Sequence, residues 1–211
     1  MTDATQTAQK LLDVQAVQLS PQQPFTWASG WKSPIYCDNR KVLSYPYIRD
    51  YIKSELCNVV FEIYPDAEVI AGVATAGIAW GAMVADQLKL PFIYVRPKPK
   101  EHGMGNQIEG HFEKEQKVVV LEDLISTGKS SLQVVEVLKA AGLCVDGMVS
   151  IFNYGFPQAA LSFEKAGVPF SSLTNYTALV QMAKDAGQIS DNLEQILLKW
   201  RDDPANWTGV Q

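Results

Sequence analysis

The chain is poor in cysteine and has fewer basic than acidic residues. Its three cysteines, Cys37, Cys57 and Cys144, include no CxxC spacing, which argues against a disulfide framework and favours reduced thiols in a cytoplasmic protein. With 18 basic and 23 acidic residues the formal net charge is −5, so we expect no nucleic-acid partner.

Long apolar runs are also missing. The longest uncharged run, Val69 to Ala85, has 17 residues, which falls short of the roughly 18–20 residues that a membrane-spanning helix needs. The polar first residues lack the basic and apolar regions of a signal peptide. We therefore expect no membrane partner and a cytoplasmic location.

Enough apolar sequence is present for a sizeable core, because 47% of the 211 residues are hydrophobic. This length predicts one domain spanning residues 1–211. Strand-like runs alternate with segments of helical periodicity, which predicts an α/β fold with an open, mostly parallel sheet flanked by helices. The predicted strands are Glu68–Val73, Phe92–Arg96, Lys117–Leu121, Val145–Phe152 and Phe170–Leu173. The predicted helices are Asp3–Leu19, Ser44–Ile63 with Ser44 as its cap, a helix after Gly77 to about Leu88, Lys129–Ala140, Pro157–Ala166, Tyr176–Ala186 and Ile189–Trp200.

The most informative stretch is VVVLEDLISTGKSS, Val118 to Ser131. Its first four residues are apolar without alternation, which is typical of a strand buried on both faces. Glu122 and Asp123 follow, and a small polar turn, Ser126–Gly128, leads into the predicted helix. Backbone N–H groups at a helix N-terminus, with a glycine and nearby hydroxyls, form a phosphate cradle. Carboxylates beside such a cradle suit a vicinal diol, directly or through hydrated Mg²⁺, so the stretch predicts a ribose 5-phosphate site.

Three other interpretations fit parts of this stretch. The sequence GKS ends a P-loop motif, but that motif requires a glycine five positions before Gly128, where the chain has Asp123. An acidic pair after a strand also occurs in phosphoacceptor receiver domains, where it follows the first strand of a much shorter chain. In an ordinary strand–helix unit the acids would only cap the helix. The Ser-Thr-Gly sequence in register before the helix favours the phosphate site.

Two earlier segments also carry candidate binding groups. Residues 20–40, which we call the hood, combine aromatic and turn residues and predict a hairpin-like element. The hood is either a packing element or a lid that holds a flat ring. Thr75, Ala76 and Gly77 follow a predicted strand, where backbone N–H groups can bind a diphosphate or simply form a plain turn.

A polar stretch without periodicity, residues 97–110, carries Lys98, Lys100 and His102. Such a stretch is unusual inside a compact domain. It predicts either a mobile loop whose cations close over a polyanion or a solvated surface hairpin.

Four motifs occur in order along the chain: FTWASGWKSPIYCDNR, GVATAG, YVRPKPKEHGMGNQIEG and VVVLEDLISTGKSS. Together they resemble the orotate phosphoribosyltransferases of bacteria over about Phe25 to Ser131. The RxxxKxHG loop followed by NQIEG, and SGxKSP near the start, are specific for that family. Other type I phosphoribosyltransferases share only the acidic pair and the Thr-Gly.

This resemblance implies a type I phosphoribosyltransferase fold with a small N-terminal hood and a mobile catalytic loop. It implies transfer of the 5-phosphoribosyl group from phosphoribosyl pyrophosphate (PRPP) to orotate, giving orotidine 5′-phosphate and pyrophosphate in pyrimidine biosynthesis. Mg²⁺ is the implied cofactor. A homodimer with shared active sites is also implied, because in the family the loop of one subunit crosses to the site of its neighbour.

The resemblance also implies roles for individual residues. The catalytic residues would be Lys100, His102 and Asp123, and Asp123 could also meet Mg²⁺ through water; no direct protein ligand of the metal is implied. The PRPP site would comprise Arg96, Lys100, His102, Glu122, Asp123, Leu124, Ile125, Ser126, Thr127, Gly128, Lys129 and Ser130. The pyrophosphate loop would be Thr75, Ala76 and Gly77, and the orotate side would be Lys32, Tyr36 and Ser126.

The chain departs from many members of the family at Ala28 and Ala76, where they carry lysine. It also has no clear match, around Asn153, for an arginine that several members place near orotate. Two rival functions are another phosphoribosyltransferase that uses a purine or a different pyrimidine, and a regulator that keeps the fold as a PRPP sensor. The hood motif argues against the first, and the basic residues of 97–110 argue against the second.

Overall fold

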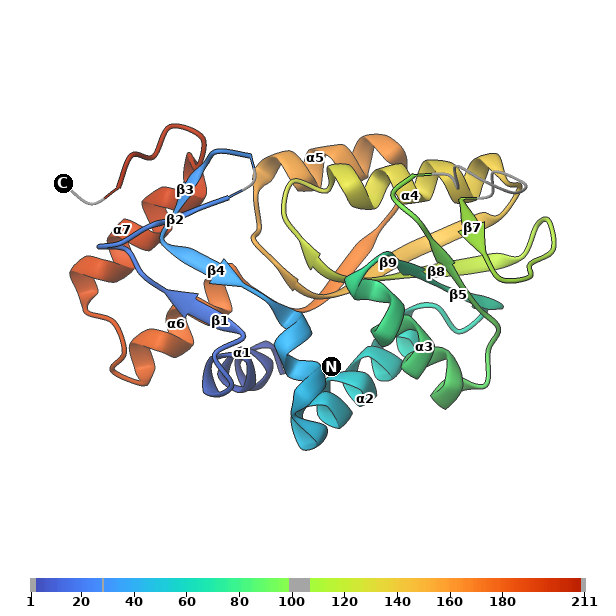
Figure 1. Cartoon of the computed structure of the whole chain (residues 1–211), viewed down its shortest axis with the longest axis horizontal. Coiled ribbons are helices and arrows are strands. Elements are labelled where there is room, and N and C mark those ends of the chain that lie inside the picture. Colours follow the sequence, from blue (N-terminus) through green and yellow to red (C-terminus); the bar gives the residue numbers. More distant parts are fainter. Residues whose placement is uncertain (1–2, 28, 99–106, 210–211) are drawn as a thin grey trace.

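A six-stranded sheet organises the chain (Figure 1), with strand order β10-β9-β8-β5-β6-β7. The computed structural model describes residues 3–27, 29–98 and 107–209. Neighbouring strands are parallel except for β7, which pairs antiparallel with β6. The strands are β5 (Val69–Val73), β6 (Phe92–Val95), β7 (Ile108–Glu109), β8 (Lys117–Ile125), β9 (Cys144–Asn153) and β10 (Phe170–Asn175). The predicted open, mostly parallel α/β sheet is confirmed.

Helices cover both faces of this sheet, with α4 and α5 on one side and α2 and α3 on the other (Figure 1). Strand β8 shows why its sequence does not alternate. Val118 and Val120 pack with the α4 and α5 side, whereas Val119 and Leu121 pack with the α2 and α3 side. The helices are α1 (Ala4–Asp13), η1 (Asn39–Ser44, a 3₁₀-helix), α2 (Pro46–Ile63), α3 (Ala76–Leu88), α4 (Lys129–Ala140), α5 (Pro157–Ala166), α6 (Tyr176–Asp185) and α7 (Asp191–Asp202).

The hood is built from short antiparallel strands, as its turn-rich sequence predicts. Strand β2 (Phe25–Thr26) pairs with β3 (Lys32–Ser33), and β4 (Ile35–Cys37) pairs with β1 (Val17–Leu19). Both small sheets lie beside α6 and α7, at the end of the molecule away from β7 (Figure 1).

Two predicted helix boundaries near the N-terminus are wrong: the end of the first helix and the start of the second. The first helix ends at Asp13 rather than Leu19, because Gln15 adopts a positive φ of 53° and the residues after it form β1. Ser44 does not cap the next helix. It ends η1, and α2 begins at Pro46 with no side-chain cap, as the fixed φ of proline allows.

The central strand is longer than predicted. It continues through Glu122 and Asp123 to Ile125, because its pairing with β9 continues to the Ile125–Asn153 pair. A further strand, β7, occupies part of the segment 97–110, for which no strand is predicted. Helix α7 begins at Asp191, where Ser190 accepts a hydrogen bond from the Leu193 N–H. Within the described residues, none of the helices combines the length and apolar character needed to cross a membrane.

Candidate functional site

A cavity of about 400 Å³ lies at the carboxyl ends of β5 and β8, where ligands bind in parallel α/β sheets. The neighbouring strands bring together the acidic pair and the turn after β5, although about 50 residues separate them in sequence. The hood contributes the third wall. The lining residues are Cys37, Asp38, Arg40, Val73, Ala74, Thr75, Ala76, Glu122, Asp123, Leu124 and Ser130.

The turn between β8 and α4 has the geometry of an anion cradle. Gly128 adopts a positive φ of 78°, and a Cβ there would lie 2.8 Å from Cε2 of Phe163, so only glycine fits without strain. Helix α4 begins at Lys129, and no side chain caps its first turn in the described chain. Its first N–H groups therefore remain available to a ligand at the positive end of the helix dipole.

Glu122 is buried, with 6% of its surface exposed. Its Oε1 accepts from its neighbour's backbone N–H at 2.9 Å, and its Oε2 accepts from the hydroxyl of Ser131 at 3.3 Å. Burial raises the pKa of Glu122 well above its ordinary value, and the charge of Asp123 raises it further. Glu122 therefore keeps a proton at higher pH than an exposed glutamate does.

Asp123 lines the same cavity as Glu122, and its carboxyl group is in hydrogen-bonding contact with the carboxyl group of Glu122. Its backbone carbonyl accepts from Nδ2 of the fully buried Asn39 at 2.7 Å, which ties η1 to the end of β8. Burial raises the pKa of Asp123, and the hydrogen bond with the Glu122 carboxyl group, followed by the charge of the Arg40 guanidinium, partly opposes that rise. Arg40 is itself oriented by Asp38, to which it donates two hydrogen bonds of 2.6 and 3.0 Å.

The predicted pyrophosphate loop forms the floor beside the acidic pair. Thr75 and Ala76 line the cavity, and the peptide bond between Ala74 and Thr75 is cis. Gly77 lies against β8, where an added Cβ would come within 2.5 Å of the carbonyl oxygen of Leu121. The glycine thus allows the loop to approach the central strand closely.

A second cavity of about 330 Å³ adjoins the first and shares Cys37 and Leu124 with it. Its walls are largely aromatic: Trp27 and Tyr154 lie with ring centroids 4.9 Å apart. Burial raises the pKa of the Tyr154 phenol well above its usual range, so this group stays neutral. The full lining is Thr26, Trp27, Tyr36, Cys37, Leu124, Ser126 and Tyr154.

Lys32 stands at the edge of this second cavity. Its Nζ donates to Oγ1 of Thr26 at 2.7 Å, so the ammonium group is held against a lining residue. Tyr36 is 40% exposed and packs against Phe25 with ring centroids 5.5 Å apart. An exposed cation and aromatic walls suit a flat, anionic ring.

Not every predicted residue lies in the two cavities. Lys100 and His102 fall outside the residues that the structure describes. Arg96 ends the segment that precedes them, and its Nη1 lies 3.6 Å from Oε1 of Glu109. Of the predicted PRPP residues, Ile125, Thr127, Gly128 and Lys129 belong to the strand end, the turn and the helix start and do not line either cavity.

Several residues that the structure places in the cavities were not predicted from the sequence. Asp38 and Arg40 follow β4 in the hood, and the charged sequence DNR after a short apolar run was the signal that could have found them. Trp27 is one of the hood aromatics, for which a lid holding a flat ring was one of two predictions, whereas Tyr154 carried no signal, because aromatic residues are far more often core than ligand contacts. Asn39 became recognisable only through its contact across 84 positions.

The chain is similar to proteins of known name over nearly its whole length. Residues 47–155 match the model of the phosphoribosyl transferase domain. The chain is 53% identical over 200 residues to an orotate phosphoribosyltransferase of Porphyromonas gingivalis, covering 95% of each, and 50% identical over 207 residues to one of Streptococcus pyogenes, covering 98% and 99%. The crystal structure of orotate phosphoribosyltransferase from Aeropyrum pernix matches with a TM-score of 0.75 and 30% identity, over 87% of this chain and 99% of that one.

Proposed function

The chain belongs to the orotate phosphoribosyltransferase family, and on this premise we propose that its two adjoining cavities are the donor and acceptor sites of that reaction. The enzyme transfers the 5-phosphoribosyl group of PRPP to orotate in pyrimidine biosynthesis. The observation that carries the site assignment is the junction of the cavities at Cys37 and Leu124. A ribose in the first cavity and a flat base in the second would meet there.

Beside the donor cavity, the uncapped start of α4, whose Ser130 lines that cavity, and the adjacent Ser126–Gly128 turn hold the 5′-phosphate. Asp123 accepts hydrogen bonds from the ribose hydroxyls, and Glu122 lines the same cavity beside it, held by the hydroxyl of Ser131. The turn Thr75–Gly77 receives the pyrophosphate. These contacts fix the sugar so that its C1 faces the second cavity, which supplies the orientation that transfer requires.

The charges that develop in the transition state determine which groups the site must supply. Breaking the bond from C1 to pyrophosphate leaves positive charge on the sugar ring and negative charge on the leaving group. We assign Arg96, Lys100 and His102 to the leaving group, which they stabilise electrostatically. Orotate already carries a negative charge, so the acceptor site needs no strong base. The neutral, buried Tyr154 is consistent with that.

The residues of the donor cavity fit Mg²⁺ that enters with the substrate. Among the described residues, no three His, Cys, Asp or Glu side chains form a ligand cage. Mg²⁺ typically binds through one or two carboxylates together with substrate oxygens, and Asp123 offers one carboxylate beside the predicted diphosphate. When bound, the ion would neutralise charge on the pyrophosphate.

We further propose a cytoplasmic homodimer of single-domain subunits with shared active sites. The support is the family membership and the position of the described residues on either side of 99–106. Arg96 and β7 lie at the edge of the sheet, beside each other.

The direct test of the function follows the loss of orotate absorbance on addition of PRPP, with and without Mg²⁺. We expect turnover that depends on both PRPP and Mg²⁺. A panel of purines and other pyrimidines serves as the specificity control. Turnover of another base in preference to orotate would contradict the acceptor assignment.

The site assignment is tested with Asp123→Asn, and the exposed Asp86→Asn on α3 is its matched control. We expect kcat/KM for PRPP to fall about 10- to 100-fold in the first variant, since a hydrogen bond to a charged group is lost. Asp86→Asn should leave it unchanged. Equal activity of the two variants would remove Asp123 from the donor site.

Lys100→Ala tests the basic segment. We expect turnover to fall by about 10²–10³ while PRPP still binds, because the lysine acts on charge that develops in the transition state. Mixing this variant with Asp123→Asn should restore partial activity through hybrid dimers. If subunit exchange is demonstrated and activity is not restored, the sites are not shared.

A further inference from the structure

Trp200, near the C-terminus, is hydrogen-bonded to the hood. The residue is fully buried on α7, and its Nε1 donates to the backbone carbonyl of Lys32 in β3 at 3.0 Å. The two residues are 168 positions apart in sequence. This bond fixes the strand whose side chain stands at the edge of the acceptor cavity.

The indole ring of Trp200 also lies directly behind that cavity. Its centroid is 5.7 Å from that of Trp27 in an edge-on arrangement, and 5.9 Å from that of Tyr154. Trp27 and Tyr154 are lining residues, whereas Trp200 is not. A ring in this place supports the cavity wall without touching a ligand inside it.

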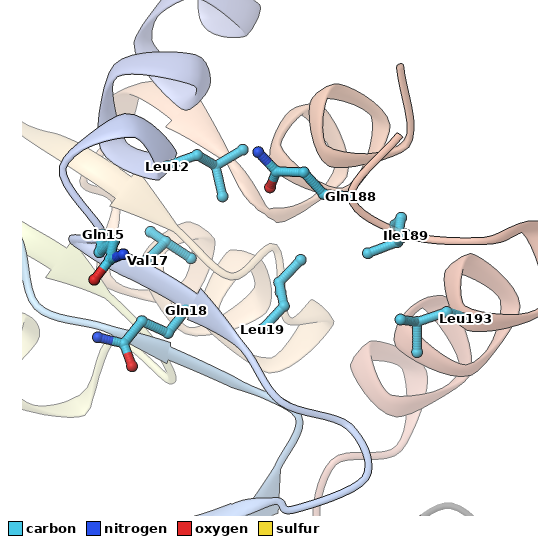
Figure 2. Close-up of a pocket in the computed structure, with 8 residues that line it drawn as sticks. All are labelled: Leu12, Gln15, Val17, Gln18, Leu19, Gln188, Ile189 and Leu193. Atoms are coloured by element: carbon cyan, nitrogen blue, oxygen red, sulfur yellow. The ribbon is translucent and has the colours of Figure 1, made fainter. Parts of the chain in front are cut away.

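A cavity lies between β1, which directly precedes the hood, and the C-terminal helices. Strand β1 and the turn between α6 and α7 enclose this cavity of about 460 Å³, shown in Figure 2. Leu19 from β1 and Leu193 from α7 point toward this space from opposite sides (Figure 2). The cavity is lined by Leu12, Gln15, Val17, Gln18, Leu19, Gln188, Ile189 and Leu193. The hydrogen bond from Trp200 to Lys32 joins α7 to the hood outside this cavity.

We propose that Trp200 is a positioning residue for the acceptor site, which makes α7 part of the machinery that selects the base. The chain of contacts is short. Trp200 holds the carbonyl of Lys32, and the Nζ of Lys32 is bonded to Thr26 on the cavity wall. The inference rests on the proposed assignment of the aromatic cavity to orotate. It predicts that a change on α7 alters affinity for the base while affinity for PRPP stays constant.

The test compares Trp200→Phe with Tyr176→Phe. Tyr176 is also buried, and its hydroxyl donates to the carbonyl of Leu197 at 2.9 Å. Each variant keeps an aromatic ring and loses one buried hydrogen bond made by or to α7. We expect both to lower the melting temperature by roughly 2–4 °C. Only Trp200→Phe should raise the KM for orotate, by about fivefold, with the KM for PRPP unchanged.

Equal effects of the two variants on the orotate KM, or a parallel rise in both KM values for Trp200→Phe, would overturn the proposal, since either result indicates general destabilisation. Tyr36→Ala, measured alongside, separates the two assumptions. If Tyr36→Ala leaves the orotate KM unchanged, the cavity assignment itself has failed. If it raises the KM and Trp200→Phe does not, only the positioning role has failed.

A measurement on the unmodified protein covers the case in which Trp200→Phe does not fold. The indole N–H resonance of Trp200 should shift when orotidine 5′-phosphate, which carries the base into the acceptor cavity without turnover, is added to the enzyme. It should not move when PRPP alone is added. A resonance that orotidine 5′-phosphate leaves in place would overturn the proposal.

Discussion

Replacing Glu122 by glutamine should stabilise the ligand-free protein. The carboxyl group is buried with 6% exposure, it lies next to Asp123, and no ion pair with a described lysine or arginine is formed. Glutamine has nearly the same shape, and its Oε1 can still accept from the backbone N–H that Glu122 now engages at 2.9 Å. The change therefore removes a buried acid and keeps most of the packing.

Active sites commonly trade stability for function, and single stabilising substitutions typically raise the free energy of unfolding by about 0.5–2 kcal/mol. For a chain of this length that gain corresponds to a rise in melting temperature of roughly 1–8 °C. We expect activity to fall at the same time, because Glu122 supports the proposed donor site.

The pH dependence identifies the cause. Burial raises the pKa of Glu122 in the folded protein. Near pH 4 and below, the group is protonated in both folded and unfolded states, so wild type and Glu122→Gln should be about equally stable. As pH rises toward the folded-state pKa, the unfolded chain releases its proton more readily, and wild type loses stability that the variant keeps.

Urea denaturation of both proteins from pH 4 to 8, without ligands, measures this difference. Glu136→Gln, which changes an exposed glutamate on α4, is the control and should differ from wild type by less than about 0.5 kcal/mol at every pH. The reasoning is refuted if Glu122→Gln is less stable than wild type at neutral pH, or if its advantage does not grow between pH 4 and 7.

Three further substitutions test the framework of the site. Gly128→Ala should destabilise the protein by about 1–3 kcal/mol and weaken PRPP binding, because Gly128 has a positive φ and lies too close to Phe163 for a methyl group to fit. Scanning calorimetry measures the loss of stability, and titration calorimetry measures the loss of PRPP affinity. Gly77→Ala should also destabilise it, since its Cβ would meet the backbone of β8, and a melting temperature equal to wild type would contradict that contact. Asn39→Ala should cost about 1–3 kcal/mol of stability and lower kcat/KM for PRPP, because the backbone carbonyl of Asp123 loses its hydrogen-bond donor. An unchanged kcat/KM in steady-state kinetics would mean that η1 does not position Asp123.

Local sequence determined the elements whose boundaries depend on local chemistry. Helix α4 spans Lys129–Ala140 and α5 spans Pro157–Ala166, as predicted. A glycine precedes the first of these helices, and the second has proline at its start and Gly167 at its end, so the signals lie within a few residues of each boundary. The four sequence motifs together likewise identified the orotate phosphoribosyltransferase family, which the relatives of the chain confirm.

Tertiary structure decided everything that depends on partners distant in sequence. Strand β8 extends through the acidic pair because β9 supplies its hydrogen-bond partners, and the first helix stops early because residues 17–19 pair with β4. The bond from Asn39 to Asp123 and the bond from Trp200 to Lys32 cross 84 and 168 positions. No local pattern records such contacts, since they exist only once the sheet has brought separate segments together. The sequence of this protein therefore determined its chemistry, and the fold decided which side chains surround that chemistry and how deeply they are buried.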